Sequence, residues 1–220
     1  MHETFLEAHS GAAVLVFGTL IAGAVAEWLV TFRERLQTEG GPRARLAFRT
    51  LVEATTTRTA GRHESDRGTK RILVLGMVAG FVAAWLAARY VPGADLPSSD
   101  WVWVILGVLI MLAGFTLRVG SIVVLGRFFR RDVTIEAAQT VIRRGPYRYI
   151  RHPAYAGNLL VALGFGLALA NWLSIAALVA LPFLGLLPRI RVEEAALESA
   201  LGEPYRAYEA DTARLVPGLW

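Results

Sequence analysis

Long apolar stretches alternate with shorter polar stretches along this chain of 220 residues. A hydrocarbon core about 30 Å thick needs roughly 20 apolar residues in a helix, because only helices and closed barrels satisfy the backbone there. The pattern therefore predicts an all-α integral membrane protein of about five transmembrane helices plus a cytoplasmic C-terminal helix. The five predicted spans cover residues 11–32, 72–91, 101–126, 154–170 and 172–187.

The last two apolar stretches are shorter than the others and are separated by Asn171. We expect them to form a tight helical hairpin whose helices tilt or cross the bilayer incompletely. The further helix on the cytoplasmic side is expected to follow this hairpin.

Arginine and lysine residues are concentrated in the polar segments between the predicted helices. Ten of the 23 lie in residues 33–71 and seven more in 127–151, whereas the linkers at 92–100 and at Asn171 have none. Loops rich in Lys and Arg stay on the cytoplasmic side of a membrane. We expect the N-terminus outside, with both basic loops and the C-terminus in the cytoplasm.

The composition supports a membrane protein and argues against other classes. The chain is 55% hydrophobic with a mean hydropathy of +0.45, which is too apolar for an ordinary soluble domain. The net charge of +5 does not indicate nucleic-acid binding, because the basic residues lie between apolar runs rather than on a domain surface. Cysteine is absent, which excludes disulfides and Cys-based metal sites.

A dense group of Arg, His and Tyr residues precedes the fourth predicted helix, in the sequence RRGPYRYIRHPAYAG at 143–157. Pro146 and Pro153 disfavour helix at the residue before each, so we expect an ordered irregular loop, with Pro153 starting the helix. One interpretation of the group is a binding site, and the other is lipid-headgroup anchoring beside an aromatic belt. The anchoring residues in that second case are Arg148, Arg151, Tyr147, Tyr149 and Tyr155.

A second motif, RIRVEEAAL at 189–197, follows the fifth predicted helix. Arg189 and Glu193 are four residues apart and would share one helix face. They form either an exposed salt bridge worth about 0.3 to 0.5 kcal/mol or a pair of binding groups in a pocket.

Together the two motifs resemble those of the isoprenylcysteine carboxyl methyltransferase family and its phospholipid methyltransferase relatives. Each fixed position of Gly-x-Tyr-x-x-x-Arg-His-Pro-x-Tyr-x-Gly is filled between Gly145 and Gly157, and Arg-x-x-x-Glu-Glu-x-x-Leu is filled from Arg189. The resemblance covers about residue 125 to the C-terminus. It implies a membrane enzyme that transfers a methyl group from S-adenosylmethionine to a carboxylate.

Site residues follow from this resemblance position by position. It implies that Glu193 contacts the amino-acid end of the cofactor and that Arg189 binds the substrate, so that these two form the catalytic pair. Many relatives carry His where this chain has Gln139. The residues implied to line the S-adenosylmethionine pocket are Gln139, Thr140, Val141, Ile142, Tyr147, His152, Pro153, Ala154 and Tyr155, besides Glu193.

These residue types suit methyl transfer to a carboxylate. A sulfonium is positively charged, so Tyr ring faces attract it and Glu193 complements the amino group. A carboxylate is already ionised near neutral pH, and methyl transfer then needs alignment rather than a general base. Arg189 can hold the carboxylate in a forked hydrogen bond. The implied substrate is an isoprenylcysteine-like, lipophilic molecule that enters from the bilayer among membrane lipids.

Three other functions remain open at this point. The first is N-methylation of a phospholipid or small molecule, the second is a sterol-type membrane reductase with a nicotinamide cofactor, and the third is a non-enzymatic scaffold. The sequence argues against a soluble Rossmann-type methyltransferase, because no Gly-x-Gly-x-x-Gly follows a strand-like segment. We expect no metal site, since the histidines other than His152 lack the spacing of partner ligands.

Two charged residues fall inside predicted spans, Glu27 in the first and Arg118 in the third. They either snorkel or pair with one another, or they line the route by which an acceptor leaves the bilayer.

The expected organisation is one membrane domain over residues 1–220. Residues 10–126 would form an N-terminal part of three helices that includes the cytoplasmic loop 33–71. Residues 127–220 would supply the cofactor-binding loop, the helical hairpin and the C-terminal catalytic segment.

Overall fold

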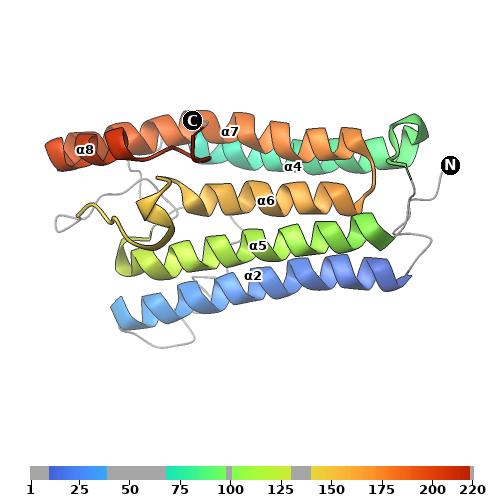
Figure 1. Ribbon diagram of the computed structural model, residues 1–220, viewed down its shortest axis with the longest axis horizontal. Coiled ribbons are helices and arrows are strands. Elements are labelled where there is room, and N and C mark those ends of the chain that lie inside the picture. Colours follow the sequence, from blue (N-terminus) through green and yellow to red (C-terminus); the bar gives the residue numbers. More distant parts are fainter. Residues whose placement is uncertain (1–9, 39–67, 98–100, 130–139, 219–220) are drawn as a thin grey trace. The chain divides into compact units, whose positions relative to one another are not determined.

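The computed structural model of the protein describes residues 10–38, 68–97, 101–129 and 140–218. Within these ranges the chain is almost entirely helical and has no β-strand, which confirms the all-α prediction. Each predicted span coincides with one long helix (Figure 1). These helices are α2 (Ser10–Thr38), α4 (Thr69–Tyr90), α5 (Trp101–Leu125), α6 (Pro153–Ala168) and α7 (Trp172–Leu201).

Four of the five helices are long and apolar enough to cross a membrane, namely α2, α4, α5 and α7. The exception is α6, whose 16 residues extend about 24 Å at 1.5 Å per residue, less than the hydrocarbon thickness. The short fourth helix was expected from its apolar run.

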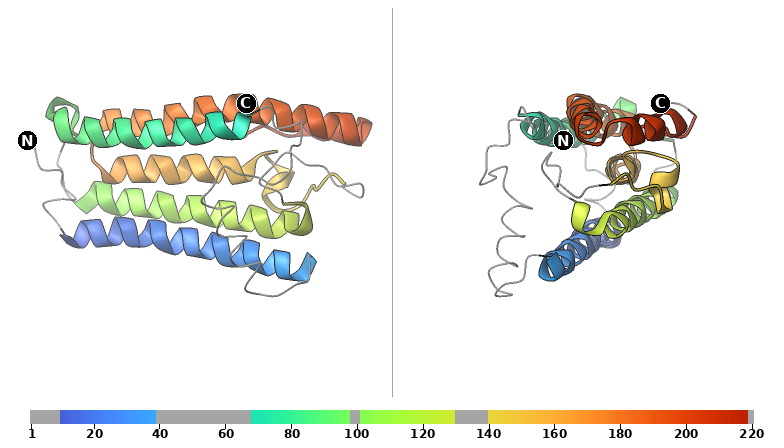
Figure 2. Two further views of the ribbon diagram at one scale, coloured as in Figure 1. Left: turned by 180° about the vertical axis from the view of Figure 1, so that it is seen from behind. Right: turned by 90° about the vertical axis from the view of Figure 1, so that its left-hand side faces the viewer.

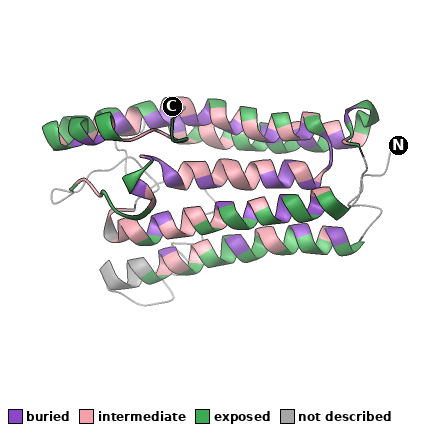
Figure 3. Cartoon of the chain, in the orientation of Figure 1, coloured by how far each residue is buried: buried purple, intermediate pink, exposed green. Residues whose placement is uncertain are grey.

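Many large apolar residues on these helices are exposed, and Figure 3 colours exposed residues of the chain green. Val14 on α2 is 72% exposed, Leu75 on α4 is 66% exposed, and Val102 on α5 is 63% exposed. An exposed apolar surface of this extent is stable against lipid and not against water. The chain is an integral membrane protein.

The C-terminal part of the fold differs from the prediction in one respect. The last span was expected to end at residue 187, with a separate helix after it, but α7 continues without a break to Leu201 (Figure 1). The apolar run ends at residue 187, but helix-forming residues, mostly Ala, Leu and Glu, continue to Leu201. The helix stops at Gly202, whose φ of 60° suits glycine, and the short helix α8 (Glu203–Asp211) follows.

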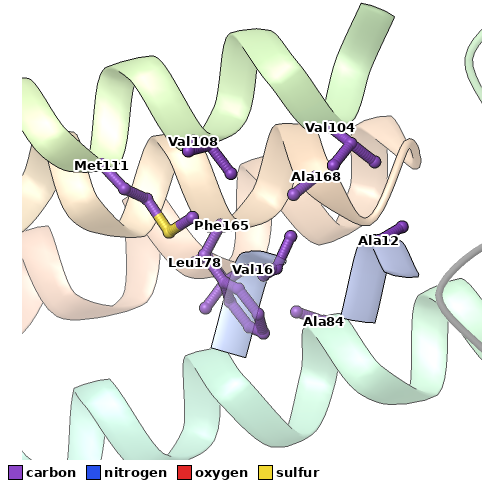
Figure 4. Packing of buried hydrophobic residues seen from close by; sticks show 9 residues of the cluster. All are labelled: Ala12, Val16, Ala84, Val104, Val108, Met111, Phe165, Ala168 and Leu178. Carbon is purple, nitrogen blue, oxygen red and sulfur yellow. The ribbon is translucent and has the colours of Figure 1, made fainter. Parts of the chain in front are cut away.

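The described residues form two compact units. The first comprises the described parts of Met1–Ala24, Ile72–Thr116 and Gly157–Leu187. In it the backbones of α5 and α6 approach so closely that a Cβ on Gly164 would lie 2.4 Å from the carbonyl oxygen of Gly107. Small residues allow such close helix packing in membranes. The core of this unit is Ala12, Val16, Ala84, Val104, Val108, Met111, Phe165, Ala168 and Leu178 (Figure 4).

The connection between α6 and α7 is the predicted tight hairpin (Figure 2). Asn171 in this connection is fully buried. Its side-chain oxygen accepts a hydrogen bond from the backbone N–H of Ser174 at 3.1 Å, while its amide nitrogen donates to Asp95 at 3.0 Å. Asn171 therefore caps the N-terminus of α7 and ties the turn to the segment after α4.

The second unit comprises the described parts of Val25–Arg71, Leu117–Ala156 and Pro188–Trp220. In this unit the C-terminal segment, residues 203–218, runs beside the loop that precedes α6. The backbone N–H of Arg151 donates to the carbonyl of Ala213 at 2.8 Å, and the N–H of Ala213 donates to the carbonyl of Tyr149 at 3.2 Å. All residues of the candidate site lie in this unit.

Candidate active site

The loop before α6 has the irregular, ordered form that its prolines predict. Residues 140–152 of this loop include the 3-10 turn η4 (Gly145–Arg148), which begins at a glycine with φ of 57°. Pro153 is the first residue of α6, as predicted, and the carbonyl of His152 accepts hydrogen bonds from the N–H groups of Tyr155 and Ala156, both at 3.0 Å. His152 and Tyr155 are therefore held at the N-terminus of this helix.

Tyr155 connects the two residues of the C-terminal motif. Its hydroxyl accepts a hydrogen bond from Nε of Arg189 at 2.8 Å and donates one to Oε1 of Glu193, also at 2.8 Å. Nη2 of Arg189 lies 3.8 Å from the same carboxylate oxygen. The intrahelical ion pair that the sequence offered as one alternative is therefore present, but Arg189 is only 3% exposed, so it is not an exposed surface salt bridge.

His152 lies between two consecutive glutamates of α7. Its Nδ1 is 3.6 Å from Glu193 and its Nε2 is 3.2 Å from Glu194. The imidazole is also stacked on the ring of Tyr155, with centroids 5.6 Å apart and an interplanar angle of 14°. Because successive residues of a helix point about 100° apart, the two glutamates meet opposite edges of the same imidazole ring.

Glu194 is surrounded by basic side chains. Oε1 accepts a hydrogen bond from Nε of Arg151 at 2.8 Å, and Oε2 accepts one from Nε of Arg214 at 2.8 Å. The Glu194 side chain is 7% exposed, against 19% for Glu193. Glu193 is thus the carboxylate that is more accessible to a ligand.

Two buried tyrosines, Tyr147 and Tyr208, connect the loop before α6 to α8. The hydroxyl of Tyr208 in α8 donates to the carbonyl of Tyr147 in η4 at 2.8 Å, and both residues are buried. Burial raises the pKa of the Tyr147 hydroxyl far above its ordinary value and raises the pKa of Tyr208 to about 12. Both hydroxyls therefore remain protonated at physiological pH.

The two charged residues within the spans pair with each other, one of the outcomes that the sequence left open. Arg118 makes a two-pronged bond to Glu27, with Nε at 2.7 Å from Oε2 and Nη2 at 2.8 Å from Oε1. Nη1 of Arg118 also donates to the carbonyl of Ala154 at 3.2 Å. The ion pair therefore also holds the first turn of α6, which carries Tyr155.

The structure brings four of the predicted site residues into one cluster, namely His152, Tyr155, Arg189 and Glu193. Thr140, Val141 and Ile142 precede η4, and no hydrogen bond or ion pair between described residues joins them to this cluster. Gln139 lies outside the described residues. The other predicted lining residues are Tyr147 and Pro153, which are buried, and Ala154, which is partly buried.

The headgroup-anchoring interpretation is wrong for three of the five residues it named. Tyr147 is buried, Tyr155 holds Arg189 and Glu193, and the Arg151 side chain is 8% exposed and bound to Glu194. Tyr149, by contrast, is 62% exposed, and Cζ of Arg148 lies over its ring, 5.8 Å from the ring centroid.

Three residues of the cluster had no predicted role at the site, namely Glu194, Arg151 and Arg214. Glu194 is the second glutamate of the motif, and a helix must turn it away from the face that carries Glu193. Arg151 and Arg214 are 43 and 20 residues away from Glu194. The repeated glutamate was a usable signal, but no local pattern pairs it with these distant arginines.

Comparison with known proteins points to one family. Residues 105–199 match the model of the isoprenylcysteine carboxyl methyltransferase (ICMT) family. This part of the chain is therefore similar to the ICMT family. The matched region includes the loop before α6 and the consecutive glutamates Glu193 and Glu194, while residues 200–220 lie beyond it.

Several individual proteins are similar to this chain. Protein-S-isoprenylcysteine O-methyltransferase A from Arabidopsis thaliana is 30% identical over 113 residues, which are 50% of this chain and 57% of the relative. The cobalt-zinc-cadmium resistance protein CzcN from Cupriavidus metallidurans is 40% identical over 81 residues, 36% of this chain and 37% of the relative. The chain thus covers little more than half the length of the plant ICMT relative.

The fold also resembles that of a solved ICMT protein. The structure of a eukaryotic intramembrane Ras methyltransferase, ICMT, superimposes with a TM-score of 0.56, covering 84% of this chain and 68% of that chain. At 21% sequence identity this similarity concerns the fold alone.

Proposed function

We propose that this protein transfers a methyl group from S-adenosylmethionine to the carboxylate of a lipophilic, isoprenylcysteine-like acceptor. The observation that carries the proposal is the cluster in which Tyr155 joins Arg189 to Glu193. The cluster combines a cation for an anionic acceptor with an anion for a cationic cofactor. The names of the ICMT relatives support the same acceptor class.

The donor set of the cluster fits the cofactor. S-adenosylmethionine, when bound, supplies a methyl group on a sulfonium centre and carries an ammonium at its amino-acid end. Glu193 is suited to the ammonium, because Glu194 is already enclosed by Arg151, His152 and Arg214. The stacked rings of His152 and Tyr155 offer an aromatic face of the kind that attracts a sulfonium.

Arg189 is assigned to the acceptor. Its guanidinium would hold the acceptor carboxylate by forked hydrogen bonds and so would orient it for methyl transfer. S-adenosylmethionine, when bound, would supply the methyl group, so that a new O–C bond replaces the S–C bond and the anion and the sulfonium would give a neutral ester and a neutral thioether. No proton moves in this step, so the cluster needs no general base.

The active site is assigned to the cytoplasmic side. The assignment rests on the charge distribution, because residues 33–71 and 127–151 hold most of the basic residues of the chain. A site at the end of the spans lets a lipophilic acceptor arrive from the bilayer while the soluble cofactor arrives from the cytoplasm.

Two variants in detergent test the assignment of roles. Glu193→Gln should lose S-adenosylmethionine binding. Arg189→Ala should abolish turnover and keep cofactor affinity, because removing Arg189 takes away a cation that now competes for Glu193. Equal loss of binding and turnover in Arg189→Ala would contradict its assignment to the acceptor. Thermal stabilisation of the parent by NADPH and not by S-adenosylmethionine would instead favour a reductase.

A further inference from the structure

The carboxylate of Glu194 is fully occupied by protein groups. Oε1 receives Nε of Arg151 at 2.8 Å and Nε2 of His152 at 3.2 Å, and Oε2 receives Nε of Arg214 at 2.8 Å. A buried carboxylate with both oxygens engaged does not bind a further ligand without losing these partners. Its role must therefore be exerted through the groups that it holds.

The groups around Glu194 come from two segments far apart in the sequence. Arg151 and His152 belong to the loop before α6, whereas Arg214 belongs to the C-terminal segment. Arg151 also donates from Nη1 to the carbonyls of Glu209 and Thr212. Glu194 and Arg151 thus fasten the C-terminal segment to the loop through charged hydrogen bonds.

This fastening fixes the orientation of His152. With Nε2 directed at Glu194, the opposite nitrogen, Nδ1, faces Glu193 at 3.6 Å and the ring stacks on Tyr155. The backbone N–H of His152 donates to the carbonyl of Arg214 at 3.0 Å, so the C-terminal segment holds this residue as well. Without Glu194 the imidazole would lose the contact that sets its angle to the site.

We infer that Glu194 is a positioning residue for cofactor binding, which acts by fastening the C-terminal segment to the loop and orienting His152 beside Glu193. The two consecutive glutamates then have separate roles, since Glu193 faces the ligand and Glu194 holds His152 and the C-terminal segment in position. This inference rests on the proposed function, because it takes S-adenosylmethionine as the ligand at Glu193.

The test compares Glu194→Gln with Glu198→Gln. Glu198 lies on the same helix and forms an exposed pair with Arg206 at 2.9 Å, which makes it a matched control. In Glu194→Gln the dissociation constant for S-adenosylmethionine should rise roughly tenfold to a hundredfold, the effect of losing hydrogen bonds to a charged group. The acceptor KM at saturating cofactor should change little. Amide hydrogen exchange in residues 149–152 and 209–215 should become faster, and Glu198→Gln should match the parent in all three measurements.

A milder pair of variants carries the test if Glu194→Gln does not fold. Arg214 is 35% exposed at its side chain, so Arg214→Ala removes one of the three partners at a site that tolerates the change. Arg214→Ala should weaken cofactor binding and speed the same exchange, and Arg214→Lys should restore most of both. Arg206→Ala, also in the C-terminal segment, is the control and should leave both unchanged.

Distinct results separate the failure of this inference from that of the proposed function. Parent-like cofactor affinity in Glu194→Gln, or weaker affinity with unchanged hydrogen exchange, would overturn the positioning role while the methyltransferase proposal stands. Parent protein that binds no S-adenosylmethionine would overturn both.

Discussion

Replacing Tyr155 with phenylalanine removes one oxygen atom from the centre of the candidate site. That hydroxyl makes two hydrogen bonds with charged groups, to Arg189 and to Glu193, each 2.8 Å long. A hydrogen bond to a charged group contributes about 1.5 to 3 kcal/mol. Since Arg189 is already 3.8 Å from Glu193, the two charges can approach each other and recover part of the loss. The net loss of transition-state stabilisation should equal about one such bond, or about 10- to 150-fold in kcat/KM.

The assay is methyl transfer by the detergent-solubilised protein over a range of acceptor concentrations at saturating cofactor. Tyr149→Phe is the matched control, because Tyr149 lies six residues earlier and is 62% exposed. Its kcat/KM should stay within about twofold of the parent, as is usual for a surface change. A folded Tyr155→Phe variant with kcat/KM equally close to the parent would refute the view that this hydroxyl organises the site.

Three further predictions concern stability. Glu27→Gln and Arg118→Met should each destabilise the protein, by up to about 3 kcal/mol, and together by less than the sum, because each single change removes the opposite charge from beside a partly buried charged group; additive losses in a double-mutant cycle would contradict this. Gly164→Ala should lower the melting temperature, since its Cβ meets a carbonyl of α5 at 2.4 Å, while Gly18→Ala, with open space, should not. The pKa of Tyr208 rises from 10 to about 12 on folding. The protonated Tyr208 hydroxyl therefore contributes fully to the free energy of unfolding below about pH 10, and this contribution is lost as the pH rises through about 12. In Tyr208→Phe the melting temperature should therefore fall less steeply with pH in the alkaline range. An unchanged slope would show that other groups cause the alkaline loss of stability.

The positions of the helices follow directly from the sequence, because apolar length and the prolines act locally. The apolar runs located α2, α4, α5 and α6 to within a few residues, apart from the polar extension of α2 to Thr38, and Pro153 marked the start of α6. The predicted end of α7 was wrong, because the length of an apolar run indicates how much of a helix lies in the membrane and not where the helix ends. Residues 188–201 include charged Arg and Glu residues and are still helical.

The candidate site was predictable where its members lie on one helix or in one motif. Arg189 and Glu193 are four residues apart on α7, and that spacing was sufficient to place them together. The contacts of Glu194 with Arg151 and Arg214 depend on how the C-terminal segment packs on the loop. Such packing is a tertiary property that no local spacing encodes, so this half of the cluster came only from the structure.

The most direct test of the account is transfer of a labelled methyl group from S-adenosylmethionine to prenylcysteine analogues and membrane lipids, followed by mild base. The account predicts that base releases the label as methanol, since a carboxyl methyl ester hydrolyses under these conditions, and that Arg189→Ala gives none. Label that stays in the lipid after base would show N-methylation and contradict the carboxylate assignment. Absence of transfer from an intact protein would contradict the methyltransferase proposal itself.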